Sequence, residues 1–222
     1  MKDEKNKIYA VFTGDVVNSS SLATGKRNDL LERLRNTYRV IKDKYPADYP
    51  YELDIFSGDS WQFVSSDPVT CLRIALLFRT YFRGYMPSLK LDTRISIGIG
   101  KISSLNPERI SQSDGEAFRL SGRALNELSN NCYMKFSSGD LVLTQAINSQ
   151  LILLDLLTSS WTEKQSLSIA GSLLGLRQKE IGELWENPIK QQSVANFLEK
   201  AGWKKIDTSL SFIENVLKSS KN

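Results

Sequence analysis

The sequence predicts a mixed α/β (α+β) fold, in which a sheet carries helices on one face and a small all-helical unit follows. Three observations favour it. Strand-like and helix-like segments alternate over residues 8–153, and only helical periodicity remains after about residue 155. The 222 residues are 41% hydrophobic and 24% charged, as is typical of a soluble globular protein. We therefore expect two domains, 1–154 and 155–222.

The first elements are a strand and a helix. Residues 8–13 are almost all apolar, which predicts a strand that is buried on both faces. Residues 24–44 carry apolar side chains at helical spacing, with charges between them, and predict an amphipathic helix. Tyr45-Pro46 ends this helix.

A hairpin and a second helix come next. Residues 51–56 and 60–65 are short strand-like runs, joined at Ser57-Gly58-Asp59 by a tight turn. The helix predicted over residues 68–83 begins after Asp67-Pro68, because proline suits the first helical position after an N-cap aspartate.

The clearest strand covers residues 91–101. Its apolar side chains alternate with Asp92, Arg94, Ser96, Gly98 and Gly100, so that the second face becomes very small toward the end of the strand. Such a face invites the close approach of another backbone or of a ligand. A helix after Asp114-Gly115, a strand at 132–136 and a helix at 140–153 complete the order β-α-β-β-α-β-α-β-α.

Composition excludes several kinds of chemistry. The chain has no histidine, which excludes Ser-His or Cys-His nucleophile pairs and imidazole metal ligands. Its two cysteines favour neither a disulfide framework nor a zinc site. The charged N-terminus lacks the apolar core of a signal peptide, and no apolar run reaches the roughly 18 residues of a membrane span. We expect a cytoplasmic protein without membrane contact.

Two aspartates beside glycines are the main functional candidates. Asp15 follows Gly14 and Asp59 follows Gly58, each where strand-like sequence breaks. A carboxylate at a strand edge needs water, a cation or a donor as its partner, so the pair suggests a pocket for a cation or a phosphate. The alternative is that both are turn residues, since Gly and Asp are common in turns.

The first 140 residues resemble the catalytic domain of the class III nucleotidyl cyclases, a ferredoxin-like sheet. The matching segments, in the order of that family, are Phe12-Thr-Gly-Asp15, Gly58-Asp59, Ile97-Gly-Ile-Gly100 and the helix Gly115-Glu-Ala-Phe-Arg-Leu-Ser-Gly-Arg-Ala124. The front domain is also similar to that of the bacterial SatD-type proteins. No single segment is specific, but the four occur in the family's order and spacing.

The resemblance implies a nucleotide site that uses Mg²⁺ or Mn²⁺. Asp15 and Asp59 correspond to the metal ligands, and Arg123 corresponds to the arginine that stabilises the transition state. The nucleotide contacts that it implies are Gly14, Gly58, Gly115 and, through a loose loop alignment, Gln112. Arg119 stands where active cyclases have asparagine, and Ile55 stands where a purine-reading lysine is expected. The resemblance thus favours a metal or nucleotide pocket over turnover.

Elementary chemistry supports such a pocket independently. Two carboxylates can bridge divalent cations, which polarise a phosphoryl group, and Mg²⁺ prefers oxygen ligands. Arg119 and Arg123 are four residues apart on a helix, so they share a face and could both bind phosphate oxygens. The alternative is that they form solvated ion pairs with Glu116 and Glu127.

The C-terminal segments resemble a helix-turn-helix. The segment 176–185, a turn and the segment 190–202 would form the two helices, which Gly182 would allow to cross closely. The side chains expected to face a DNA groove are Lys190, Gln191, Gln192, Ser193 and Asn196. The region is nearly neutral, which suits DNA binding less well, and a helical bundle for dimerisation or protein contact is the alternative.

Together these patterns predict a bacterial DNA-binding regulator that binds a nucleotide or phosphorylated ligand with a divalent cation. A homodimer is expected, because the related enzymes build their sites across two chains and the tail would read paired half-sites. One alternative is an active cyclase or nucleotidyl transferase that uses Asp15, Asp59 and Arg123. A second is an adaptor that makes only protein contacts.

Overall fold

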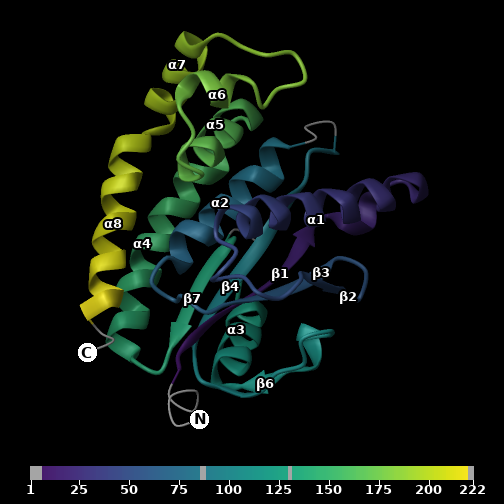
Figure 1. Cartoon of the computed structure of the whole chain (residues 1–222), viewed down its shortest axis with the longest axis vertical. Helices are drawn as coiled ribbons and strands as arrows, with labels where there is room; N and C mark the ends of the chain where they lie inside the picture. The colour runs from purple at the N-terminus through teal and green to yellow at the C-terminus, as the bar shows by residue number, and fades with distance from the viewer. Residues whose placement is uncertain (1–6, 86–88, 130–131, 220–222) are drawn as a thin grey trace.

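The computed structural model describes residues 7–85, 89–129 and 132–219, and shows a mixed α/β layer followed by a helical region (Figure 1). The strands are β1 (Tyr9–Val17), β2 (Asp54–Phe56), β3 (Ser60–Ser65), β4 (Asp92–Gly100), β5 (Ile102–Ser104), β6 (Asp114–Gly115) and β7 (Met134–Ser138). The helices are α1 (Arg27–Lys44), α2 (Cys71–Gly84), α3 (Glu116–Asn126), α4 (Leu141–Ser160), α5 (Glu163–Leu173), α6 (Gln178–Gly182), α7 (Gln191–Ala201) and α8 (Trp203–Ser219). The predicted fold class is confirmed.

The main sheet has the strand order β2-β3-β1-β4-β7, and β5 pairs with β6 in a separate ribbon. β1 is antiparallel to both of its neighbours, β3 and β4, whereas β4 and β7 are parallel. β1 continues past residue 13, where the sequence analysis ended it, because its pairing with β4 extends to Val17. Asp15 therefore lies inside a strand and not after one.

One face of the sheet holds the main apolar core. Its side chains alternate along each strand, and Phe12, Trp61 and Phe63 from β1 and β3 are completely buried there. The Trp61 ring stacks on Phe78 of α2 with 4.2 Å between the ring centroids. The buried leucines of α1 belong to the same core. This packing fixes α1, and with it the loop that connects β1 to α1.

The other face is covered by α3, which approaches the sheet very closely. A Cβ atom added at Gly98 would lie 2.2 Å from the carbonyl oxygen of Ala117, so the small face of β4 serves the approach of a helix backbone. Thr13 and Ser121 are joined by a buried hydrogen bond of 2.9 Å. Helices thus cover both faces, which corrects the expectation of one covered face.

The boundary predicted at residue 155 lies inside α4. This helix starts at the N-cap Asp140, whose carboxylate accepts from the amide of Leu143 at 3.0 Å, and continues to Ser160. Asp155 is buried and accepts a hydrogen bond from Arg79 of α2 at 2.7 Å. Burial raises the pKa of Asp155, while Arg79 and the amides of Met134 and Tyr133 oppose that shift. The chain therefore has no break at the predicted position.

The C-terminal helices are docked on the α/β layer through α2 (Figure 1). A Cβ atom added at Gly84 would lie 2.6 Å from the Cβ of Leu167, so α5 crosses α2 at close range. The guanidinium of Arg73 on α2 donates to Asp207 at 2.8 Å and to Glu214 at 2.6 Å, both on α8. Buried side chains of α5, α7 and α8 share one apolar core with the sheet.

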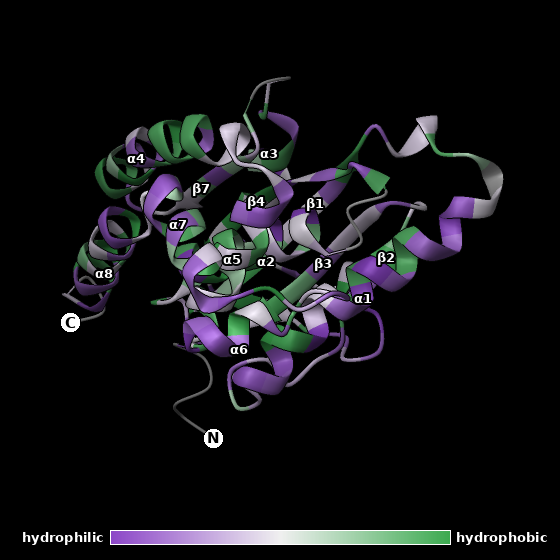
Figure 2. Ribbon diagram, turned by 90° about the horizontal axis from the view of Figure 1, so that it is seen from above, coloured by the Kyte–Doolittle hydropathy of each residue, from purple (hydrophilic) through white to green (hydrophobic). Residues whose placement is uncertain are grey.

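Hydropathy distinguishes α4 from the other helices (Figure 2). Within the described residues, α4 is the one helix that is long and apolar enough to cross a membrane by length and composition. Only 22% of the 18-residue window that meets this test is buried inside the protein. Asp155, which lies in the helix, bonds to the rest of the chain.

Candidate functional site

Asp15 forms an ion pair across the sheet. In the antiparallel register Asp15 lies directly opposite Arg94, and both side chains are on the face that α3 partly covers. The guanidinium donates from Nε to Oδ1 at 2.8 Å and from Nη2 to Oδ2 at 2.5 Å. This is the bidentate arrangement in which arginine binds carboxylates most strongly. Both oxygens of Asp15 therefore already have a fixed cationic partner.

Asp59 lies in the tight turn between β2 and β3. Gly58 before it has a φ of +89°, a conformation that favours glycine. The Asp59 carboxylate accepts a short hydrogen bond from the hydroxyl of Ser19, which is in the loop after β1. The hairpin predicted from Ser57-Gly58-Asp59 is thus present, and its turn contacts the β1–α1 loop.

Arg94 connects the two aspartates electrostatically. The hydrogen bonds to Asp15 raise the pKa of the Arg94 guanidinium; burial opposes the shift, and the charges of Asp15 and Asp59 add to it. The charge of Asp59 acts on Arg94 although the two residues are in different elements. The structure therefore brings both predicted carboxylates to the same end of the sheet, where an arginine lies beside them.

A pocket of about 400 Å³ lies between the β1–α1 loop and the β2–β3 turn. Its lining is mostly polar: Ser19, Ser20, Leu22, Ala23, Arg27, Leu30, Ser57, Gly58 and Asp59. The Arg27 guanidinium lies against Gly58, since an added Cβ there would be 2.0 Å from Nη2. We call this the Asp59 pocket. Asp15 does not belong to its lining.

The donor set does not fit the two-cation centre that the resemblance implies. Such a centre needs both carboxylates as ligands, whereas both oxygens of Asp15 bond to Arg94. Within the described residues, no group of three or more acidic or thiol side chains is placed to hold a metal ion. In Asp59, Oδ2 accepts the hydrogen bond from Ser19, so Oδ1 is the oxygen that could bind a ligand. Asp59 also lines the pocket.

Three of the residues expected to contact a nucleotide lie elsewhere. Gly14 packs on the core face, where an added Cβ would be 2.2 Å from the Trp61 ring. Gly115 is buried against the backbone of Lys101 and Ile102 in the β5–β6 ribbon. Gln112 is exposed and accepts from the Asn106 amide at 3.2 Å. None of the three is part of the Asp59 pocket lining, which does include Gly58.

The two arginines on α3 are solvent-exposed. Arg119 forms an ion pair with Asp114 at 2.7 Å, and half of its side chain is exposed. Arg119 therefore forms a solvated ion pair, as the alternative interpretation expected. Its partner is Asp114, however, and neither Glu116 nor Glu127. Arg123 is exposed on the same helix and is not part of the Asp59 pocket lining. That Arg123 stabilises a transition state, as the cyclase resemblance implies, stays a prediction.

The candidate DNA-contacting residues lie at the start of α7. Lys190, Gln191, Gln192 and Asn196 are exposed, and Ser193 is half-buried. Gly182 ends α6, where an added Cβ would be 2.4 Å from the carbonyl oxygen of Ile189, so the turn folds tightly back on the helix. Ile181 and Val194 are fully buried between α6 and α7. This geometry leaves one polar face of α7 open to solvent.

The sequence analysis missed two arginines of this site. Arg94 stood on the polar side of the predicted strand, and a β1–β4 register would have placed it opposite Asp15. Arg27 was part of an amphipathic helix and had no distinguishing motif. Contacts between β1 and β4, and between Arg27 and Gly58, come from long-range pairing, which local periodicity does not encode.

Several solved structures are similar to part of this chain. The catalytic core of a rhodopsin-guanylyl cyclase with converted specificity, in complex with ATPalphaS, is 17% identical, with a TM-score of 0.43 over 55% of this chain and 73% of that one. The guanylyl cyclase Cya2 is 13% identical, with a TM-score of 0.42 over 60% and 75%. The adenylyl cyclase CyaB from P. aeruginosa is 18% identical, with a TM-score of 0.38 over 55% and 72%.

These similarities cover 55–60% of this chain. Identities and scores at this level carry no conclusion about what the chain binds or converts. No protein-family model matches the sequence, and no curated protein matches it significantly.

Proposed function

We propose that this protein is a bacterial, cytoplasmic DNA-binding regulator whose α/β layer binds a nucleotide or another phosphorylated molecule. The observation that carries the proposal is the Asp59 pocket, whose lining includes Arg27 together with Ser19, Ser20 and Ser57. The ligand enters at the pocket and DNA is bound at the start of α7. Two copies of the chain act together on paired half-sites.

The lining of the Asp59 pocket suits phosphate. Arginine presents a planar fork of donors that matches phosphate oxygens, and serine hydroxyls add further donors. Arg27 is also the first residue of α1, an 18-residue helix whose free amide groups favour an anion at this end. The Asp59 carboxylate, in contrast, accepts hydrogen bonds and attracts positive charge, so it favours a sugar hydroxyl, a base amine or a cation. A phosphorylated ligand with such a group satisfies both parts of the pocket.

In this proposal a divalent cation has one carboxylate ligand from the chain and not two. Any Mg²⁺ or Mn²⁺ accompanies the phosphates of the ligand and meets Asp59, the carboxylate with a free oxygen. Asp15 stays bonded to Arg94, which supplies a fixed positive charge at this end of the sheet.

The DNA-binding part rests on α6 and α7. A short helix and an 11-residue helix with an exposed polar start support a helix-turn-helix. The connection over residues 183–190 is longer than the turn usual in this motif. Because α5 packs on both α2 and this unit, a ligand that orders the α/β layer has a packed route to α7. The exposed amides of Gln191 and Gln192 suit base edges, and Lys190 suits a phosphate.

A calorimetric titration with nucleoside mono-, di- and triphosphates tests the pocket. The wild-type chain is expected to bind at least one of them, and Arg27→Gln is expected to weaken binding about tenfold, or about 1.4 kcal/mol. Lys26→Gln is the matched control, because Lys26 is adjacent, exposed and paired with Asp29. Equal affinities of the Arg27→Gln variant and the wild type would contradict ligand binding in the Asp59 pocket.

A gel-shift assay with random duplex pools tests the tail. Retention of DNA should be lost in Lys190→Glu and kept in Lys200→Glu, which makes the same charge change at the other end of α7. Equal loss in both variants would indicate non-specific attraction to lysines. Full retention in both would contradict DNA binding through the start of this helix.

Two alternatives make different predictions. An active cyclase or nucleotidyl transferase would convert nucleoside triphosphates with Mg²⁺ or Mn²⁺, in a reaction abolished by Asp15→Asn and by Arg123→Ala. The pairing of Asp15 with Arg94 and the exposure of Arg123 argue against it. An adaptor would bind neither nucleotide nor DNA, and would fail both assays above.

A further inference from the structure

The outer face of α4 carries six of the seven large hydrophobic side chains that are exposed on the described part of the chain. Six of its side chains are between 48% and 78% exposed: Leu141, Val142, Ile152, Leu153, Leu156 and Leu157. They correspond to about four fully exposed leucines, on the order of 700 Å² of surface, whereas a stable interface uses about 800 Å² per partner. Soluble proteins seldom leave so large an apolar patch without a partner.

This face carries no exposed charge. The one charged residue of the helix, Asp155, points inward and bonds to Arg79. Depletion of charge is a property of the centre of protein interfaces. A helix that lies on a membrane surface, by contrast, carries lysines or arginines on its polar side, and α4 contains neither. The chemistry of the face therefore favours a protein surface that is equally apolar.

The arrangement of side chains along α4 is self-complementary. Between Leu141 and Leu157 the exposed positions are 141, 142, 145, 146, 149, 152, 153, 156 and 157, a set that is symmetric about Ser149. Helical spacing alone makes such sets nearly symmetric, but here the symmetry also relates the small Ala146 to the large Ile152. Small Ala146 and Ser149 lie at the centre, and large apolar side chains lie at both ends.

We propose that α4 packs antiparallel against α4 of a second copy of this chain, across a twofold axis at Ser149. The two Ser149 residues then face each other where the helices are closest. Val142 meets Leu156, and Ala146 meets Ile152, so that a small side chain lies opposite a large one. The homodimer of the proposed function would then be formed through α4. This contact does not depend on the binding of a ligand or of DNA.

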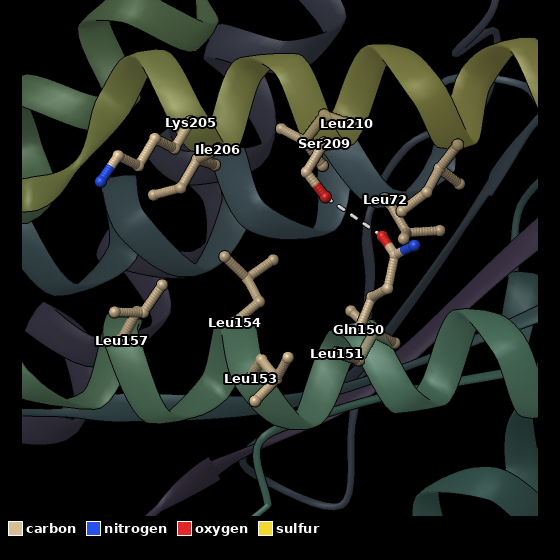
Figure 3. A pocket seen from close by; sticks show the side chains of 11 residues that line it. Leu72, Gln150, Leu151, Leu153, Leu154, Leu157, Lys205, Ile206, Ser209 and Leu210 are labelled. Carbon is tan, nitrogen blue, oxygen red and sulfur yellow. Dashed lines mark hydrogen bonds between the residues drawn. The ribbon is translucent and has the colours of Figure 1, made fainter.

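The groove beside α4 fits the same arrangement. α4 and α8 lie side by side, joined by a hydrogen bond of 3.1 Å between Ser209 and Gln150 (Figure 3). Leu153, Leu154 and Leu157 face Lys205 and Ile206 across a groove of about 160 Å³. Ligand pockets begin at about 300 Å³, so this groove suits an inserted side chain better than a small molecule. Leu141 of the second copy, opposite Leu157, is placed to enter it.

Cysteine cross-linking tests the register of the pair. In a Cys132→Ser background, which removes the half-exposed native thiol, Ser149→Cys should oxidise to a disulfide-linked dimer. The yield should be at least several-fold above that of Ser160→Cys, an exposed position on the same helix outside the symmetric set. The buried Cys71 remains, since burial raises its thiol pKa. Equal yields from the two variants would overturn the proposal.

A mixing experiment fixes the direction. Gln145→Cys and Leu153→Cys should each cross-link poorly alone, and should form a mixed dimer when the two proteins are combined. Strong self-linking at position 145 would indicate parallel helices and would contradict the proposal.

Sedimentation gives an independent measurement. The wild-type chain should be dimeric at tens of micromolar, and Leu156→Glu should be monomeric with an unchanged circular dichroism spectrum, because Leu156 is 72% exposed. A monomeric wild type, or a dimer that survives Leu156→Glu, would overturn the proposal. So would flotation of a monomer with phosphatidylcholine vesicles, which would identify the face as a membrane contact.

Discussion

Two arginines on opposite faces of the sheet bind aspartates with similar geometry but in different surroundings. Arg79 is fully buried and bonds to Asp92 and Asp155, so that it joins α2 to β4 and α4. Arg94 is 31% exposed and bonds to Asp15 at the same end of the sheet as Asp59. Arg79 binds Asp92 in a bidentate manner and Arg94 binds Asp15 in the same manner. Arg79 differs in having a second aspartate partner and in being closed to water. Burial makes the first pair a structural connection, whereas exposure leaves the second within reach of ligands.

The largest expected effect concerns the buried pair. Asp155→Ala removes the acceptor of Arg79 Nη1 and of two backbone amides, and should lower the free energy of unfolding by about 3–5 kcal/mol. Urea denaturation measures this, with Asp114→Ala as the control, because Asp114 pairs with Arg119 in solvent. A loss below 1 kcal/mol for Asp155→Ala would mean that burial does not separate the two regions.

A smaller effect is expected at the turn that carries Asp59. Gly58→Ala places a side chain at a φ of +89° and against the Arg27 guanidinium, and should cost about 1–2 kcal/mol of stability. Because Arg27 must move, affinity for a phosphorylated ligand should fall as well. Gly25→Ala, where an added Cβ meets nothing within 4 Å, should leave both quantities unchanged. Thermal melts with and without ligand measure the two effects.

The smallest effect is expected on the exposed face of α3. Arg119→Gln breaks a solvated ion pair with Asp114 and should change stability by less than about 0.5 kcal/mol. It should leave ligand affinity unchanged, since Arg119 does not line the Asp59 pocket. A marked loss of ligand binding in this variant would instead restore the role that the cyclase resemblance gives to this helix.

The sequence pattern was sufficient for the main strands and helices but not for their partners, and it did not predict the short strands β5 and β6. Apolar alternation located the strands, and the Ser57-Gly58-Asp59 turn located the hairpin, because these signals are local. The expectation of helices on one face failed at α3. Its contact with the sheet is partly polar, through the hydrogen bonds of Thr13, Ser96 and Ser121. It is also partly apolar, because Ala117 and Phe118 belong to a second, smaller apolar cluster on that face. The apolar spacing of the helix was visible in the sequence, but which face of the sheet it covers follows only from the long-range contacts.

The site was predicted in part for the same reason. The β1–β3 register pairs Gly14 with Trp61 and so places Asp15 and Asp59 at the same end of the sheet, while their role as metal ligands stays a prediction. The residue that lies beside both, Arg94, follows only from strand register. The boundary predicted near residue 155 falls within α4, where Arg79 bonds to Asp155. The division into two domains stays a prediction. A change from mixed to purely helical sequence periodicity need not mark a domain limit, because one helix can pack against elements that precede it and elements that follow it.

The most direct measurement is a calorimetric titration of Mn²⁺ into the wild-type chain and into Arg94→Ala. If Arg94 is the fixed cation that neutralises Asp15, its removal leaves the Asp15 carboxylate without its counter-charge at the same end of the sheet as Asp59. Mn²⁺ should then bind at least tenfold more tightly, a gain of about 1.4 kcal/mol. Asp15→Asn in the same variant should reverse the gain. Tight Mn²⁺ binding by the wild-type chain, unchanged in Arg94→Ala, would contradict the account.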